Sequence, residues 1–341
     1  MIVDRPHRGK VRTSGEMADA RKILGWDVGG TKSAAVLGTA EGEILARREW
    51  PSGAPRGPEA MIADFLPQAR ELLAEAGGVE GVGVSIGGPL NPLEGVVLSP
   101  PHLPKWDRVP LVEVLQRELG LPVVIEHDAA ACLLAEWLWG AARGTTHAIY
   151  LTCGTGCGAG VLIDGRVLRG PRGQSPEVGH IRLAPDGPEM FGKAGCTESF
   201  CSGEGIGKLA GFLFPQRFGA STDTRQLAEQ AAGGDADARA VLIESARRTG
   251  QLCALLADTF SPEVIALGSL ARYFAPWWLA EIVAAFRAEA LPANSAHTRI
   301  VPAALGEGLQ DRSPIAAWVY RGSAPGSGHT DTPQQMSTLN E

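Results

Sequence analysis

Ile23-Leu-Gly-Trp-Asp-Val-Gly-Gly-Thr-Lys32 is the most informative segment of this chain. An apolar strand runs into Asp27 and then into the turn Gly29-Gly30-Thr31. Glycines allow a tight turn whose backbone N–H groups can approach a phosphate. The Thr31 hydroxyl can add a contact, and Asp27 can hold a magnesium-bound water. Gly-Gly turns between strands are common, so this segment alone is equally compatible with a plain turn.

A second segment of the same kind favours the phosphate interpretation. In Tyr150-Leu-Thr-Cys-Gly-Thr-Gly-Cys-Gly-Ala-Gly160 an apolar strand again runs into a glycine turn, Gly154-Thr155-Gly156. The chain then returns as a strand through Ile163. Two phosphate-sized turns, far apart in the sequence, suggest two lobes that face one nucleotide.

The composition is typical of a two-domain globular protein. A chain of 341 residues with 44% hydrophobic residues can form about two domains, each with a sizeable core. The formal net charge of −7, from 31 basic and 38 acidic residues, disfavours a nucleic-acid surface. No apolar run approaches the roughly 20 residues of a membrane span. We therefore expect neither nucleic acid nor a membrane as a partner.

The cysteines and the chain ends predict a cytoplasmic protein with loose termini. The six cysteines include no Cys-x-x-Cys pair, so we expect reduced core thiols rather than a disulfide framework. Residues 1–21 carry charge but no apolar signal core; they are predicted to be a disordered leader, in which Met17 could be the true start. Residues 322–341 have the composition of a flexible tail.

Strand and helix patterns alternate in the first lobe and give way to helices in the second. In the first lobe we predict strands at 23–28, 34–38, 43–48, 80–86 and 122–126, helices at 58–76 and 110–119, and a helix that starts after Asp128 and runs to Trp139. In the second we predict strands at 147–152, 158–163, 166–169 and 262–268, and helices at 235–260 and 311–320. The predicted N-terminal lobe is 22–128 with helix 311–321, and the larger C-terminal lobe is 129–310.

Three polar clusters can carry chemistry between the lobes. Asp128 stands where a strand ends and a helix begins, so it is either a helix N-cap or a general base at the mouth between the lobes. Glu177 and His180 can point to one side of a turn and bond the hydroxyls of a polyol, although a lone histidine is more often structural. Glu198 follows a turn near a helix start, where the helix dipole can explain it without a ligand.

Taken in order, these segments resemble the ROK family, which holds bacterial glucokinases, other hexose and N-acetylhexosamine kinases, and sugar-responsive repressors. The resemblance covers roughly residues 22–320. Its motifs are Asp27-Val-Gly-Gly-Thr-Lys32, Ser85-Ile-Gly-Gly-Pro89, His127-Asp128-Ala, Gly154-Thr-Gly156, Glu177-Val-Gly-His180 and Gly195-Cys-Thr-Glu198. It implies the two-lobed α/β fold of actin and hexokinase (ribonuclease H-like), with ATP and a sugar in the cleft between the lobes.

The resemblance also implies a role for each matched residue. Asp128 corresponds to the catalytic base, and Asp27 would hold Mg²⁺. The sugar would be bound by Gly88, His127, Glu177, His180 and Glu198, with the loop 98–106 beside it. The ATP phosphates would meet Gly29, Gly30, Thr31, Lys32, Gly154, Thr155, Gly156 and Gly268.

Two positions depart from the family pattern. His127 replaces the usual asparagine before the catalytic aspartate; imidazole can bond a hydroxyl, but it is larger and can charge near neutral pH. Many members bind a structural zinc through the Gly-His histidine and three cysteines, whereas the matching run here is Glu189-Met-Phe191-Gly-Lys-Ala-Gly-Cys196. One thiolate and His180 cannot close a tetrahedral site, and Cys201 is the one further candidate, so we expect no zinc.

The resemblance predicts an ATP-dependent sugar kinase, with glucose and its 6-hydroxyl as the first choice of acceptor. The alternatives are an N-acetylhexosamine or other hexose kinase of the same family, and a catalytically weak sugar-binding protein. A repressor would need a helix-turn-helix ahead of the sugar module, which the first 22 residues do not suggest. A Rossmann dehydrogenase is disfavoured because the first turn lacks Gly-x-Gly-x-x-Gly. We also expect a homodimer; Trp277-Trp278 would suit either its interface or the core.

The cysteine replacements predict the metal content of the protein. Because Glu189 and Phe191 stand where thiolates are required, purified protein should contain far less than one zinc per chain. For the same reason, a chelator should leave its melting temperature unchanged. Elemental analysis and paired melting curves measure both quantities. Stoichiometric zinc would contradict the prediction and would indicate Cys196, Cys201 and His180 as ligands.

Overall fold

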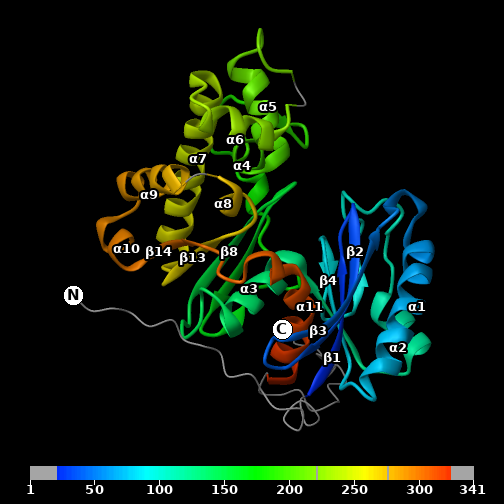
Figure 1. Cartoon of the computed structure of the whole chain (residues 1–341). Helices are drawn as coiled ribbons and strands as arrows, with labels where there is room; N and C mark the ends of the chain where they lie inside the picture. The colour runs from blue at the N-terminus through cyan, green and yellow to red at the C-terminus, as the bar shows by residue number, and fades with distance from the viewer. Residues whose placement is uncertain (1–20, 220–221, 275, 324–341) are drawn as a thin grey trace, which may run out of the picture.

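Two five-stranded mixed sheets form the framework of the two lobes (Figure 1). The computed structural model describes residues 21–323 except 220, 221 and 275. The first sheet contains β1 (Lys22–Val28), β2 (Lys32–Thr39), β3 (Ile44–Pro51), β4 (Val82–Ile86) and β7 (Val123–His127), in the order β3-β2-β1-β4-β7. The second contains β8 (Ala148–Cys153), β9 (Cys157–Ile163), β10 (Arg166–Val167), β13 (Val264–Leu267) and β14 (Arg299–Pro302), in the order β10-β9-β8-β13-β14.

The two sheets share one topology. In the first, β1 pairs antiparallel with β2 and parallel with β4, which pairs parallel with β7. In the second, β8 pairs antiparallel with β9 and parallel with β13, which pairs parallel with β14. The two glycine turns therefore occupy corresponding positions, one between β1 and β2 and the other between β8 and β9. The likeness of the turns extends to the whole sheets.

Two helices connect the lobes. Helix α3 (Asp128–Trp139) begins directly after β7 of the first sheet and packs on β8 and β9 of the second. Helix α11 (Leu309–Ser323) follows the second sheet in the chain but packs on β1 and β4 of the first. The two helices also pack against each other between the sheets (Figure 1). The chain thus crosses between the lobes twice, at neighbouring places.

The remaining elements cover the sheets or extend the connections. Besides its sheet, the first lobe contains α1 (Pro58–Ala76), α2 (Leu111–Leu119), β5 (Leu90–Asn91), β6 (Val96–Val97) and the 3₁₀ turn η1 (Ala54–Arg56). Trp26 of β1 stacks on Phe65 of α1 with ring centroids 4.2 Å apart. The second lobe adds the turn η2 (Val178–His180), β11 (Glu189–Met190), β12 (Lys193–Ala194), α4 (Thr197–Cys201), α5 (Gly203–Leu213), α6 (Thr224–Ala232), α7 (Ala236–Phe260), α8 (Leu270–Tyr273), α9 (Pro276–Glu289), α10 (Pro292–His297) and the turn η3 (Gly306–Gly308).

The predicted elements are present, most of them within a few residues of their predicted ends. The prediction missed β14 and the two-residue strands β5, β6, β11 and β12, and among the helices after β10 it gave bounds only for α7 and α11. Trp278 of α9 proves to be a core residue with 1% exposure. Of the predicted leader the structure describes Arg21, which pairs with Glu80, and α11 includes residues 322 and 323 of the predicted tail. The rest of both segments lies outside the described residues. Within 21–323, apart from the three omitted positions, no helix is long and apolar enough to span a membrane.

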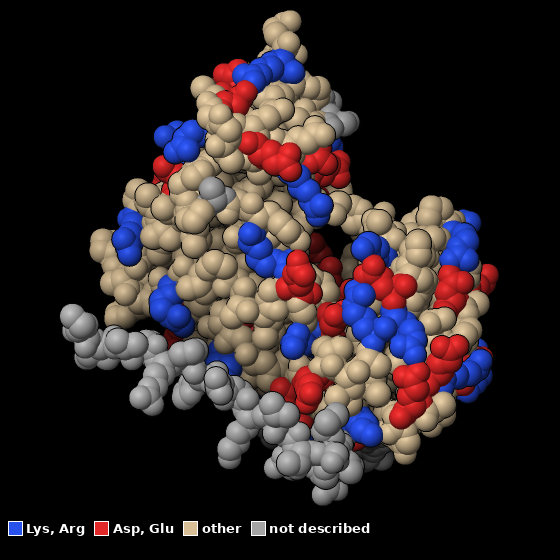
Figure 2. All heavy atoms as spheres, viewed as in Figure 1, with Lys and Arg blue, Asp and Glu red and all other residues tan. Residues whose placement is uncertain are grey.

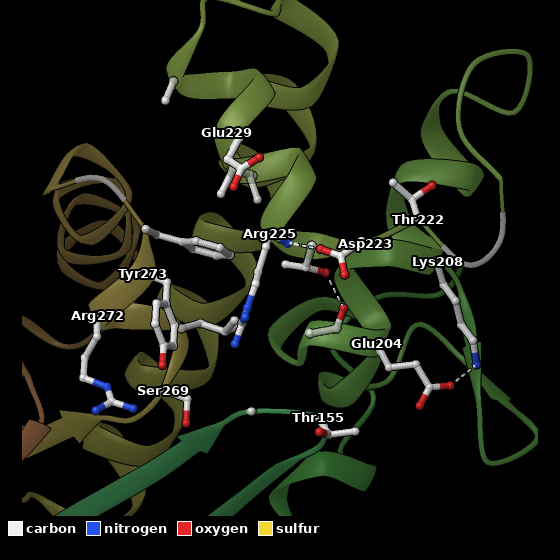
Figure 3. Close-up of a pocket in the computed structure, with 18 of the residues that line it drawn as sticks. Thr155, Glu204, Lys208, Thr222, Asp223, Arg225, Glu229, Ser269, Arg272 and Tyr273 are labelled. Carbon is white, nitrogen blue, oxygen red and sulfur yellow. Dashed lines mark hydrogen bonds and ion pairs between the residues drawn. The ribbon is translucent and has the colours of Figure 1, made fainter. Parts of the chain in front are cut away.

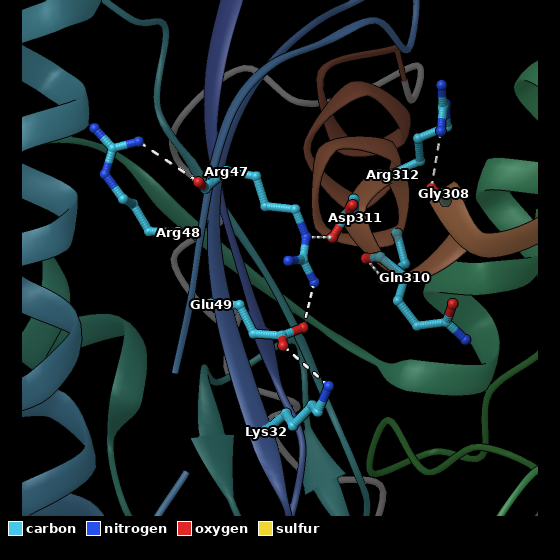
Figure 4. Close-up of polar contacts among 9 residues, drawn as sticks. Lys32, Arg47, Arg48, Glu49, Gly308, Gln310, Asp311 and Arg312 are labelled. Atoms are coloured by element: carbon cyan, nitrogen blue, oxygen red, sulfur yellow. Dashed lines mark hydrogen bonds and ion pairs between the residues drawn. The ribbon is translucent and has the colours of Figure 1, made fainter. Parts of the chain in front are cut away.

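Helix α11 packs on the first sheet at a glycine, which has no side chain to separate the backbones, and through an ion pair. A Cβ added to Gly83 of β4 would lie 1.9 Å from the carbonyl oxygen of Pro314, so only glycine allows this approach. At the sheet edge, Arg47 of β3 donates to Asp311 of α11 at 2.8 Å (Figure 4). These contacts fix the helix that joins the second lobe to the first.

Gly83→Ala should therefore destabilise the protein. Overpacking costs about 1–3 kcal/mol in well-packed interiors, and here the clash is with backbone rather than with a flexible side chain. The melting temperature, followed by circular dichroism, should fall. Gly322→Ala is the matched control. Gly322 lies in α11, the helix that Gly83 contacts; an added Cβ there meets nothing within 4 Å, and alanine favours a helix. Equal melting temperatures for the two variants would contradict this packing.

Candidate active site

The site lies where parallel strands of the first sheet end. The register places Asp27 of β1 beside Ser85 of β4, and Ser85 beside Glu126 of β7. Strand β7 ends at His127, and α3 begins with Asp128. The carboxyl ends of parallel strands meet at one edge of a sheet, where α/β proteins commonly bind ligands. This edge faces the second lobe, and a hollow between the lobes is visible in Figure 2.

A cavity of about 440 Å³, named here the acceptor cavity, opens at this edge. The first lobe contributes Gly30, Thr31, Gly87, Gly88, Pro101, His102, His127 and Asp128 to its lining. The second contributes Thr152, Thr155, Gly156, Cys157, Gly158, Glu177, His180, Phe191 and Glu198. The structure thus brings Asp128 together with all five residues that the sequence assigned to sugar binding. It adds His102, from the loop 98–106 that was expected beside the sugar, and Phe191, which the sequence analysis had considered only as a missing zinc ligand.

Asp128 does not occupy the N-cap position of α3. It is the first residue of the helix, the cap position belongs to His127, and no side chain caps the helix end. Asp128 Oδ1 accepts a hydrogen bond from the neighbouring Ala129 N–H at 2.6 Å. The side chain is 48% exposed on the acceptor cavity. Asp128 thus satisfies one N–H of the first helical turn without being the N-cap, and its carboxylate keeps acceptor capacity toward the cavity.

Asp27 lies close enough to Asp128 for the two carboxylates to affect each other. Burial raises the pKa of Asp27 to about 8, the charges of Asp128 and Asp311 add to the shift, and the neighbouring Ser85 hydroxyl and Arg47 oppose it. A carboxylate whose charge is disfavoured by burial and by a neighbouring anion gains from pairing with a hard divalent cation. Mg²⁺ typically takes one or two carboxylates and completes its shell with water and substrate phosphates, so the Asp27 carboxylate fits it. In the described part of the chain, no cluster of three or more His, Cys, Asp or Glu side chains could hold an ion alone.

His127 occupies space that Gly88 leaves open. A Cβ on Gly88 would lie 2.6 Å from Cδ2 and 2.9 Å from Nε2 of the imidazole. The Nδ1 atom of His127 is buried without a hydrogen-bond partner and lies 3.4 Å from Asp128 Oδ1. The imidazole is thus held at the wall of the cavity, between Gly88 and Asp128.

The carboxylate of Glu198 is buried beside the second glycine turn. It is 6% exposed, and its Oε2 accepts from the Cys157 N–H at 3.2 Å. Burial raises its pKa, while the hydrogen bond from Cys157 and the nearby His102 and His180 oppose the shift. Glu177 and His180 are exposed at the end of the cavity formed by the second lobe. The predicted cluster of two carboxylates and one imidazole is thus assembled around one space.

A second, larger cavity of about 1070 Å³ adjoins the acceptor cavity and shares Thr155 with it. Besides Gly154 and Thr155, its lining includes Glu204, Lys208, Asp223, Arg225, Ser269, Arg272, Tyr273 and Trp277 (Figure 3). The guanidinium groups of Arg225 and Arg272 lie 5.3 and 5.4 Å from the centre of the Tyr273 ring. Apart from Gly154 and Thr155, no motif indicated these residues, because they come from separate short segments. We call this space the donor cavity.

The glycine turns offer fewer free N–H groups than the sequence suggested. The N–H of Gly29 donates to Lys32 O at 3.0 Å, and that of Gly154 donates to Gly156 O at 3.1 Å. The residues that line the acceptor cavity are instead Gly30, Thr31, Thr155 and Gly156. Two backbone groups assigned to phosphate are therefore already used within the turns.

Lys32 and Gly268 are likewise not placed as phosphate contacts. The ammonium of Lys32 is exposed and lies 3.0 Å from Glu49 Oε1 on β3 (Figure 4). Gly268 donates its N–H to Leu151 O at 2.8 Å, and its Cα faces the Tyr150 hydroxyl, which a Cβ would approach to 2.3 Å. Gly268 thus acts as a spacer at the end of β13, and Ser269 is the residue that reaches the donor cavity.

The candidate zinc ligands do not converge. Cys196 is buried with its Sγ 4.0 Å from Met190 O, and Cys201 Sγ accepts from the Thr249 hydroxyl at 3.4 Å within the helical core. The His180 ring instead stacks on Phe191. These residues do not fit a tetrahedral zinc site, and the predicted absence of zinc stays a prediction.

Comparison with known proteins agrees with this geometry. The profile of the ROK family matches residues 23–308. The chain is 36% identical over 188 residues to a glucokinase of Streptomyces coelicolor, an alignment that spans 55% of this chain and 58% of the relative. It is 34% identical over 283 residues to an N-acetylmannosamine kinase of Shigella flexneri, which spans 81% of this chain and 94% of the relative.

Solved structures show the same architecture. A ROK hexokinase from Thermus thermophilus superimposes with a TM-score of 0.77 at 32% identity, covering 89% of this chain and all of that one. A ROK glucokinase from Streptomyces griseus, solved with glucose and AMPPNP, has a TM-score of 0.72 at 29% identity and covers 87% of this chain and 97% of that one. The two-lobed actin/hexokinase-like fold is thereby confirmed, and this chain belongs to the ROK family.

Proposed function

We propose that this protein is an ATP-dependent sugar kinase that transfers the γ-phosphate to a hexose hydroxyl, with glucose at its 6-hydroxyl as the first candidate. One observation carries the proposal: the half-exposed Asp128 carboxylate borders a sugar-sized cavity that joins a nucleotide-sized cavity at Thr155. A general base has to reach the attacking hydroxyl on one side while the phosphoryl group arrives from the other. The named kinases among the relatives support the same reaction.

Asp128 would take the proton of the acceptor hydroxyl as its oxygen attacks. Phosphoryl transfer asks the protein mainly to align the groups and to neutralise charge. Mg²⁺ held through Asp27 would supply charge neutralisation for the donor phosphates and would leave Asp128 free to accept the proton. The free N–H groups of Gly30, Thr31, Thr155 and Gly156 would orient those phosphates, since the N–H groups of Gly29 and Gly154 are bonded within their turns.

The sugar ring would be oriented from the second lobe. Glu198 keeps Oε1 as a hydroxyl acceptor because only Oε2 accepts from Cys157, and Glu177 and His180 add two further contacts. His127 and Gly88 would meet the ring from the first lobe. Because both lobes contribute to the cavity, closure on the sugar would complete it and exclude water as a competing nucleophile.

The choice of acceptor stays open between glucose and an N-acetylhexosamine. The relative aligned over the larger share of this chain is an N-acetylmannosamine kinase, whereas the other is a glucokinase. An ADP-release assay with glucose, mannose, fructose, allose, N-acetylglucosamine and N-acetylmannosamine would decide. A protein that binds one of these sugars without turnover would favour the sensor alternative.

Two further expectations belong to this proposal. We propose a cytoplasmic enzyme, because the six cysteines are all free and buried, as in reducing compartments. We also propose a homodimer, to be measured by light scattering. The burial of Trp278 removes that residue from its interface, and half-buried Trp277 already packs under Arg239 at 4.3 Å.

His127→Asn should change the preference among sugars more than it changes the KM for ATP. His127 lines the acceptor cavity beside Gly88, so its imidazole would meet the sugar ring. One hydrogen bond between the imidazole and a sugar hydroxyl is worth about 0.5–1.5 kcal/mol, roughly a three- to tenfold change in kcat/KM. The measurement is kcat/KM for each sugar of the panel in both proteins. Unchanged ratios across the panel would show that residue 127 does not contact the ring.

Asp128→Asn should abolish most turnover while sugar and ATP still bind. General bases contribute about 10²–10⁴-fold, so turnover should fall at least a hundredfold. Turnover, calorimetric sugar affinity and a melting curve are measured together. Asp164→Asn, in an exposed hairpin turn outside both cavities, is the matched control and should behave as wild type. If Asp128→Asn keeps more than about a tenth of wild-type turnover, Asp128 is not the base.

A further inference from the structure

The hairpin formed by β11 and β12 carries an unusual residue at its tip. Met190 pairs with Lys193, so Phe191 and Gly192 form a two-residue connection. Both have left-handed backbones, with φ of 52° and 69°. These values match a type I′ turn, which favours Asn, Asp and Gly, and a bulky residue with positive φ is an outlier. Such an outlier points to a function for the side chain.

The Phe191 side chain stacks on His180. The ring centroids are 4.8 Å apart and the planes differ by 22°. Both rings line the acceptor cavity, and Phe191 is 47% exposed. A large apolar ring that is half exposed contributes little to a core, so core packing does not explain its presence at a strained position.

The same hairpin also holds the backbone of His180. Lys193 Nζ donates to His180 O at 2.7 Å. No side-chain hydrogen bond fixes the imidazole itself among the described residues. The stack on Phe191 is therefore the contact that limits rotation of the imidazole, while the ring edge stays free toward the cavity.

We propose that Phe191 is a positioning residue that holds the His180 imidazole in place for the sugar. This inference rests on the proposed function. In family members with a zinc site, the metal would hold the corresponding histidine. In this protein the candidate zinc ligands do not converge. The stack of the Phe191 ring, at the tip of hairpin 189–194, holds the His180 imidazole instead.

Three substitutions separate this role from a role in folding. Phe191→Asn suits the left-handed backbone better but removes the ring, so the melting temperature should stay or rise. The KM for the sugar should nevertheless rise about three- to tenfold, the effect of one weakened hydrogen bond, with kcat and the KM for ATP near wild type. Phe191→Tyr keeps the stack and should retain the wild-type KM. Phe212→Leu, at a 50% exposed position on α5 outside both cavities, is the control.

Sugar titration by calorimetry without ATP gives the same comparison independently of turnover. A weakened sugar affinity in Phe191→Asn together with a normal one in Phe191→Tyr would support the inference. Wild-type affinity in Phe191→Asn, or an equal loss in both variants, would overturn it. The ring protons of His180, followed by NMR, report the stack itself: their upfield shift should vanish in Phe191→Asn.

The proposed function and this inference can fail separately. A wild-type protein that neither phosphorylates nor binds any sugar of the panel would overturn the kinase proposal. In that case, equal chemical shifts of the His180 ring protons in wild type and Phe191→Asn would overturn the stacking inference as well. If the upfield shift were lost in Phe191→Asn, the stack would be established, and His180 would be held in place for a ligand other than these sugars.

Discussion

The parallel register of β1, β4 and β7 is the constraint on which the site depends. It aligns Asp27, Ser85 and Glu126 in one row and ends the strands where α3 begins with Asp128. Burial in this row raises the pKa of Asp27 to about 8, and the nearby charge of Asp128 adds to the shift. A cation bound at this edge would offset the negative charge of the carboxylates and would allow the donor phosphates to approach.

The second sheet repeats the topology of the first and supplies the other half of the cleft. Its glycine turn, Gly154-Thr155-Gly156, lies between the acceptor and donor cavities, so the reacting groups would meet at Thr155. The crossings between the lobes are close together, at the mutually packed helices α3 and α11. Movement of one lobe against the other would therefore change the width of the cleft while leaving both sheets intact.

The acceptor side of the site departs from its family in a consistent way. His127 stands where the family pattern has asparagine, and the Phe191 ring, in the run that lacks the family's cysteines, stacks on His180. Aromatic and imidazole rings thus line a cavity whose carboxylates, Asp128, Glu177 and Glu198, match the family motifs. Rings are rigid and fill more space than an asparagine side chain, so the shape available to the sugar depends on how these rings pack.

Much of the fold could be predicted from local sequence. The strand-glycine-strand segments, the helix from Pro58 to Ala76 and the start of α3 after His127 follow from periodicity, glycine and proline positions that act within a few residues. The ordered motifs also named the residues around the acceptor cavity.

The motifs did not reveal that the N–H groups of Gly29 and Gly154 are bonded within their turns, that Lys32 pairs with Glu49, or that Phe191 stacks on His180. Likewise, no sequence motif indicated the donor cavity, which Arg225 and Tyr273 line. The reason is physical. Helix and strand preferences depend on neighbouring residues, whereas each of these contacts depends on the distance between segments that are far apart in the sequence, and only the packing of the sheets and helices sets that distance.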